Sequence, residues 1–187
     1  MFWHFPGYLG AGGGTLTAGN STPLTDGASA VLLCSESWAR ERGLPIAAYL
    51  TYAREAAVDF VHGEGLLMAP AYAVSDMLKE ANLALQDFDF YEIHEAFAAQ
   101  VLGCLAAWKS DDYCKTELGL DGALGEMNEA VLNAEGGAIA LGHPVGASGT
   151  RIVLHLLHAL KRTGKKRGMA AICIGGGLGG AMLVEAL

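Results

Sequence analysis

Short apolar runs alternate with segments of helical pattern along this chain, and this alternation constrains the fold more than any other feature. The runs with the length and composition of strands are residues 28–34, 46–53, 88–93, 169–174 and 181–187. Helices are expected at residues 35–43, 70–82, 95–109, 111–118 and 147–163. Strands that alternate with helices indicate an α/β fold with helices on both faces of a sheet. A short glycine-rich turn joins the last two strands, so we expect them to be antiparallel and the sheet to be mixed.

The composition excludes several classes of protein. With 12 Lys+Arg against 20 Asp+Glu, the net charge is −8, and no large basic block offers a surface for nucleic acid. An apolar content of 52% with 17% charged residues is too apolar for a disordered chain. The longest apolar stretch, residues 168–184, is rich in glycine and shorter than the ~20 residues of a membrane span. We therefore expect no integral membrane segment.

The cysteines and the first residues bear on location. The four cysteines are too few and too widely spaced for a disulfide scaffold, and no Cys-x-x-Cys pair is present. Residues 1–14 form an irregular leader of aromatics and glycines, without the basic start or apolar core of a secretory signal. We expect a reducing compartment, the cytoplasm, with an organelle matrix left open. His155 and His158 lie three apart on an expected helix, but no third ligand is near in sequence, so no metal site is predicted.

Three clusters place a reactive side chain beside a strand end or a glycine turn. The first is at His94, where an expected strand stops and an expected helix begins. The backbone N–H groups and the dipole of a helix N-terminus favour developing negative charge, which suits a reactive site. The alternative is structural: His94 caps the helix and Glu95 complements its dipole.

The second cluster is residues 136–149, a run of small residues around His143. Gly142 and Pro144 flank this imidazole, which is left with little backbone freedom. A neutral imidazole fixed in this way can act as a general base toward a thiol or a bound ligand. The alternative is a glycine-rich turn with a solvated histidine. The segment is not a phosphate-binding P-loop, because no Gly-Lys-Ser/Thr follows.

The third cluster begins with Cys173 at the end of an expected strand and continues into the glycines at 175–177. A cysteine there can present its thiol at a site, and successive glycine amides can hold an oxyanion. The alternative is a buried strand cysteine followed by a hairpin turn. A dinucleotide-binding loop is not predicted, because its glycine pattern requires a following helix and here a strand follows.

Together and in this order, the three clusters resemble the motifs of the thiolase family. Residues 94–98 resemble its Asn/His-Glu-Ala-Phe-Ala motif, residues 142–144 its Gly-His-Pro motif, and residues 173–177 its Cys-x-Gly-Gly-Gly motif. Residues 17–28 are similar to the family segment that enters the last strand of the N-terminal domain. The resemblance runs from about residue 15 to residue 187, and histidine at position 94 is similar to the long-chain, trifunctional-complex branch.

The resemblance implies an acyltransferase that cleaves 3-ketoacyl-CoA with coenzyme A in fatty-acid β-oxidation, or runs the reverse Claisen condensation. It implies that Cys173 is the acid/base at the α-carbon and that His143 activates the nucleophilic cysteine. With His94, His143 is implied to polarise the thioester oxygen. The remaining implied roles are an oxyanion-binding amide, a pocket-lining ring and a position near coenzyme A, at Gly175, Phe97 and Thr22. Coenzyme A is then a substrate, acyl-CoA molecules are the small partners, and no covalently bound cofactor is implied.

The resemblance also divides the chain. Residues 15–44 correspond to the tail of the N-terminal thiolase domain, a remnant strand and helix, and residues 45–187 to a C-terminal domain with a mixed five-stranded sheet. Thiolases carry the nucleophilic cysteine in a full N-terminal domain, and no cysteine here matches that motif. We expect the chain to be inactive alone and to act as a homo-oligomer or with a complementary N-terminal half. Two alternatives stay open: a non-catalytic module for coenzyme A binding or subunit assembly, and a truncated gene product.

Overall fold

A four-stranded mixed sheet forms the centre of the computed structural model, which describes residues 15–63 and 65–187. The strands are β1 (Ala48–Ala57), β2 (Phe90–Ile93), β3 (Arg167–Gly175) and β4 (Leu178–Ala186). Their order across the sheet is β1-β4-β3-β2, with β1/β4 and β3/β4 antiparallel and β2/β3 parallel. The predicted mixed sheet and the antiparallel last pair are confirmed. The leader predicted at residues 1–14 lies outside the described residues.

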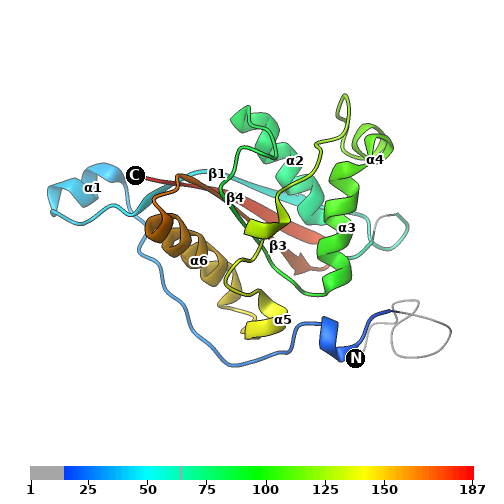
Figure 1. The fold of residues 1–187 in the computed structure, drawn as a ribbon, viewed down its shortest axis with the longest axis horizontal. Helices are drawn as coiled ribbons and strands as arrows, with labels where there is room; N and C mark the ends of the chain where they lie inside the picture. The colour runs from blue at the N-terminus through cyan, green and yellow to red at the C-terminus, as the bar shows by residue number, and fades with distance from the viewer. Residues whose placement is uncertain (1–14, 64) are drawn as a thin grey trace.

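Helices cover both faces of this sheet, as predicted (Figure 1). Successive residues of β3 point to opposite faces, and the two apolar clusters follow this alternation. Met169 and Ala171 pack with α2 (Ala69–Ala81) and α3 (Ala98–Lys109). Ala170 packs with α6 (Ser148–Thr163), whose apolar side reaches the other face. The α/β class therefore follows from two apolar layers on one sheet.

The helix ends agree with the capping chemistry of the sequence. Ser35 caps α1 (Glu36–Glu41), because its hydroxyl accepts from the Trp38 N–H at 3.3 Å. Ser110 ends α3 and caps α4 (Asp111–Thr116) in the same way, with the Tyr113 N–H at 3.1 Å. Gly164 ends α6 with φ +67°, a left-handed conformation that favours glycine. Two 3₁₀ turns, Ala18–Asn20 and Glu129–Val131, and the short α5 (Ala138–Leu141) complete the elements.

Two strand predictions are wrong. The sheet has four strands in the part of the chain described, not five, and next to β2 there is only an isolated parallel bridge between Tyr91 and Leu132. The segment 28–34, predicted as a buried strand, is irregular chain in which Leu32 and Leu33 are 71% and 64% exposed. A strand needs a neighbour for its backbone hydrogen bonds, and these residues have none among the named strands.

This irregular segment leads away from the body of the molecule. Figure 1 shows it running below α5 and α6 to reach α1 at the far side, beside the end of β4. An apolar pocket of about 390 Å³ lies where the segment and α1 meet the start of β1, and it is lined by residues 32–36, 39, 44–46 and 48–50. Among the described residues, no helix has both the length and the apolar character needed to cross a membrane.

Candidate active site

Two histidines that are far apart in sequence meet at one end of the sheet. The ring centroids of His94 and His143 are 4.2 Å apart, and the rings are tilted by 45°. His94 follows β2 directly, and its backbone N–H donates to the Ala171 carbonyl of β3 at 2.9 Å. The loop between α5 and α6 carries His143. The site therefore lies where β2 ends, at the carboxyl edge of the parallel pair.

The loop that presents His143 depends on its flanking residues. Gly142 has φ +94°, and a Cβ there would lie 2.5 Å from the Thr25 side chain, so the position requires glycine. The Arg151 guanidinium donates to the Gly142 carbonyl at 2.6 Å. On the other side, the Pro144 carbonyl accepts from the backbone N–H of Ser148 at 3.0 Å as α6 begins. The imidazole thus projects from a loop held on both sides.

Residues 22–25 link the two histidine loops. The Thr22 N–H donates to the Ala96 carbonyl at 3.1 Å, which joins this segment to the loop after His94. The His143 N–H donates to the Pro23 carbonyl at 2.9 Å, and the Thr25 N–H donates to the His143 carbonyl at 3.3 Å. We call residues 22–25 the strap, because three backbone hydrogen bonds hold it across both loops. Thr22, predicted to lie near coenzyme A, therefore lies beside the histidine pair.

Glu95 has a different role from the one considered in the sequence. Helix α3 begins at Ala98 with Phe97 as its N-cap residue, so the alternative in which His94 caps this helix and Glu95 complements its dipole is wrong. Instead, the Glu95 carboxylate accepts from the Asn133 side chain at 2.8 Å and from the Ile139 N–H of α5 at 3.1 Å. It fixes the start of the turn that leads to His143.

Both imidazoles are neutral near pH 7. Burial, together with smaller contributions from the nearby His143 and Arg151, lowers the pKa of His94 to about 4. Burial also lowers the pKa of His143, with Arg151 adding to the effect. The Ser148 hydroxyl donates to the Pro144 carbonyl at 3.3 Å and lies 2.7 Å from Nδ1 of His143. In the tautomer in which this hydroxyl directs its proton at the Pro144 carbonyl, Nδ1 donates to Ser148 and the lone pair of Nε2 is left to act as a base.

Cys173 lies on the parallel neighbour of the strand that ends at His94. In the register of β2 and β3, Ile93 pairs with Ala171, so the sulfur belongs to the same end of the sheet. Its Sγ donates to Oε1 of Gln100 on α3 at 3.9 Å. Burial raises the pKa of this thiol to about 11, so it carries its proton at neutral pH. A protonated thiol in this position is suited to donating a proton rather than to nucleophilic attack.

The other predicted residues fall into two groups. Phe97 forms an isolated bridge with Ser21 next to the strap, and the Thr22 hydroxyl is buried without a hydrogen-bond partner in the described part of the chain. Gly175 is exposed and is the last residue of β3, with φ +89°. The structure thus brings Thr22 and Phe97 beside the loop of His94, whereas Gly175 continues the strand of Cys173.

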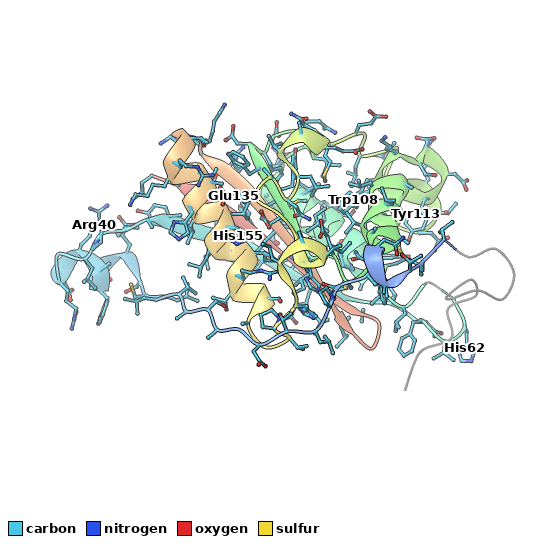
Figure 2. The ribbon with its side chains drawn as sticks, turned by 60° about the horizontal axis from the view of Figure 1, so that its bottom comes forward. Arg40, His62, Trp108, Tyr113, Glu135 and His155 are labelled. Carbon is cyan, nitrogen blue, oxygen red and sulfur yellow. The ribbon has the colours of Figure 1, made fainter. Side chains whose placement is uncertain are left out.

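The sequence analysis did not identify three residues of the site, namely Gln100, Ser148 and Arg151. A single amide on the otherwise apolar helix α3 was the available signal for Gln100. His155, considered with His158 as a metal pair, lies instead 3.7 Å from the buried Glu92 (Figure 2 labels His155 on α6). In the described ranges, no group of three or more His, Cys, Asp or Glu side chains is placed to hold a metal ion.

The motifs and this geometry agree with a comparison to known protein families. A sequence model described as the thiolase C-terminal domain matches residues 44–186. The chain belongs to the thiolase family. Thiolases from Shewanella loihica and Serratia proteamaculans, both named 3-ketoacyl-CoA thiolase, are each 45% identical over 172 residues. These matches cover 92% of this chain and 39% of each relative, so the chain spans about two fifths of their length.

Solved thiolases have the same fold. The acetyl-CoA acetyltransferase of Bacillus anthracis superposes with a TM-score of 0.77 at 37% identity, covering 93% of this chain and 39% of that one. Human mitochondrial 3-ketoacyl-CoA thiolase in complex with CoA also gives 0.77, at 36% identity and with the same coverage. The prediction of a thiolase-like α/β domain is therefore confirmed.

Proposed function

We propose that this chain supplies the acid/base part of a 3-ketoacyl-CoA thiolase site and takes its nucleophilic cysteine from a complementary N-terminal half. The observation that carries the proposal is the pair of neutral imidazoles, 4.2 Å apart, at the edge of the sheet to which Cys173 belongs. Acyl transfer between thiols needs a base for the attacking thiol, hydrogen-bond donors for the carbonyl oxygen and an acid for the leaving carbon. The side chains gathered here can supply each of these.

In the proposed reaction, Nε2 of His143 accepts the proton of the nucleophilic thiol, and the thiolate attacks the 3-keto carbon of the substrate. The carbon–carbon bond breaks, the acyl group stays on that sulfur, and the electron pair forms the enolate of acetyl-CoA. The Cys173 thiol protonates this enolate, in accord with its high pKa. The sulfur of coenzyme A then attacks the carbonyl carbon of this acyl-enzyme, and its thiol proton passes to the Cys173 thiolate. The shortened acyl-CoA is released, and the nucleophilic thiolate takes its proton back from His143. The condensation direction uses the same groups in reverse.

The remaining residues have supporting roles in this proposal. His94 and His143 polarise the thioester oxygen, and the Gly175 amide stabilises a second oxyanion. Phe97 lines the acyl pocket, and Thr22, whose buried hydroxyl has no hydrogen-bond partner among residues 15–63 and 65–187, contacts coenzyme A. Coenzyme A is a substrate rather than a bound cofactor. It is present in the human relative solved with CoA.

The proposed complementary half binds on the irregular segment 28–34. Leu32 and Leu33 face solvent there, and they lie at the edge of the apolar pocket beside α1. A patch of exposed leucines on a segment that pairs with no strand in the described part of the chain favours a partner that adds strands and covers the leucines. A second copy of this chain is the other partner that such a surface allows.

Turnover tests the proposal directly. The chain is incubated with a 3-ketoacyl-CoA and coenzyme A, alone and with a separately produced N-terminal half of a related thiolase, and products are measured by mass spectrometry. We expect acetyl-CoA and a shortened acyl-CoA only when both halves are present, and loss of both in the variant His143→Ala. Turnover by the chain alone would contradict the assignment of the nucleophile to the other half.

Calorimetric titration with coenzyme A separates the alternative of a non-catalytic module. Binding of coenzyme A or of the N-terminal half without any turnover of the pair would favour that module. Absence of both binding and turnover would favour a truncated product without independent function, in which the exposed leucines drive self-association.

A further inference from the structure

A buried amide lies between two thiols on the side of the sheet opposite α6. Gln100 of α3 is 6% exposed, and it follows Phe97 within one helical turn. Its Oε1 lies 3.9 Å from Cys173 Sγ, and its Nε2 lies 3.5 Å from Cys104 Sγ. Both cysteines are buried, at 7% and 0% exposure. The proposed reaction assigns no role to Gln100 or Cys104.

The two ends of the amide face different partners. Nε2 donates to the Cys104 sulfur four residues further along the same helix, so this end is occupied. Oε1 is a pure acceptor and faces Cys173, whose thiol donates to it. An amide held in this orientation cannot turn its N–H groups toward the Cys173 sulfur. The amide therefore accepts a hydrogen bond from the protonated thiol but donates none to the thiolate.

We propose that Gln100 is a positioning residue for Cys173, which holds the thiol in one rotamer with its proton on the Gln100 oxygen, while Cys104 fixes the orientation of the amide. This inference rests on the proposed acid/base role of Cys173. Gln100 touches neither substrate nor coenzyme A in this proposal and acts through the thiol alone. Because α3 begins directly after Phe97, one helix then connects the orientation of the thiol to the loop that carries His94.

Infrared spectroscopy of the S–H stretch tests the donated hydrogen bond in the full chain. The stretching frequency of a thiol falls when the thiol donates a hydrogen bond, and few other protein groups absorb in that window. Difference spectra against Cys173→Ala, Cys104→Ala and Cys114→Ala assign the bands of the three buried thiols. We expect the Cys173 band to move to higher frequency in Gln100→Met, which keeps the length of the side chain and replaces the amide oxygen by a thioether, a much weaker acceptor.

Two controls accompany this variant. Gln100→Glu keeps an acceptor oxygen and should leave the Cys173 band at low frequency. Cys114 donates to the carbonyls of Ala107 and Trp108, at 3.4 and 3.6 Å, and not to Gln100, so its band should stay unchanged in both variants. A general loosening of α3 and α4 would move the Cys114 band as well, whereas the positioning role moves only that of Cys173.

Several outcomes would overturn the inference. One is a Cys173 band at the same frequency in Gln100→Met and in the unmodified chain. Another is a shift of the Cys104 band alone, which would mean that the amide has the reverse orientation. If Gln100→Met does not fold, the spectrum of the unmodified chain still tests the inference. A Cys173 band at the frequency of a non-bonded thiol would exclude a hydrogen bond from this thiol to the Gln100 oxygen. None of these spectra requires turnover, so failure to reconstitute activity would count against the proposed function and not against this hydrogen bond.

Discussion

The replacement His94→Asn should remove a large part of the acid sensitivity of this protein. The His94 ring is 2% exposed, and burial places its pKa at about 4 against 6.5 for a free imidazole. The folded state therefore binds a proton less readily than the unfolded chain. The contribution of the neutral His94 to the free energy of unfolding is fully present above about pH 6.5 and is lost as the pH falls toward 4. At about 1.4 kcal/mol for each pKa unit, His94 alone costs about 2 kcal/mol at pH 5 and about 3 kcal/mol at pH 4.

Urea unfolding followed by circular dichroism, repeated from pH 8 to pH 4.5, measures this effect. Subtracting the free energy of unfolding of His94→Asn cancels the groups that titrate in both proteins. The free energy of unfolding of the unmodified chain minus that of His94→Asn should be constant above pH 7 and should be lower by about 2 kcal/mol at pH 5. His62→Asn is the matched control, because its side chain is 82% exposed and the same subtraction reports a surface imidazole. A flat difference for His94→Asn, or a slope equal to that of the control, would refute the role of burial.

Three further perturbations test the packing around the site and the exposed segment. Gly137→Ala places a Cβ against the Glu95 carboxylate, and we expect a loss of about 1–3 kcal/mol in urea unfolding; unchanged stability would contradict that contact. Leu156→Ala empties a fully buried position on α6 and should cost about 2–5 kcal/mol in the same assay, whereas Leu102→Ala, at 60% exposure, should stay within about 0.5 kcal/mol. Leu33→Lys should reduce self-association in sedimentation velocity without changing stability, since Leu33 is 64% exposed, and association that persists would place the contact elsewhere.

The sheet and its helices could be predicted because local patterns determine them. Residues 70–82 have an apolar stripe at helical spacing, and α2 occupies Ala69–Ala81, where Asn82 in a left-handed conformation ends it. Segment 28–34 shows the limit of this reasoning. An apolar run of seven residues indicates that the segment is buried in some environment, but it does not identify the neighbouring strand. The pattern at 28–34 is therefore that of a strand, although the described residues contain no strand to pair with it.

The candidate site was predictable only in part for a similar reason. Motifs identified His94, His143 and Cys173, since each lies beside a glycine or a strand end, but their partners depend on tertiary contacts. Ser148 lies one helical turn beyond Pro144, where it reads as an ordinary residue at a helix start, and only the fold brings its hydroxyl within 2.7 Å of the imidazole. Gln100 reads as a single polar residue on an apolar helix. Sequence periodicity gives the face on which a side chain lies, but not the strand or loop that meets it.

The strap connects the imidazole pair to the exposed segment. Its Thr22 N–H bonds to the loop of His94, and its Pro23 carbonyl bonds to the loop of His143, so the spacing of the rings depends on where the strap lies. Three residues after the strap ends at Thr25, the chain enters the irregular segment 28–34, in which two leucines face solvent. A partner bound on this segment and a ligand bound at the two rings would therefore contact the same short stretch of backbone from its two ends. If either changes the affinity for the other, thermodynamic linkage requires the effect to be reciprocal and equal in size, so one titration of each ligand with and without the other tests this connection.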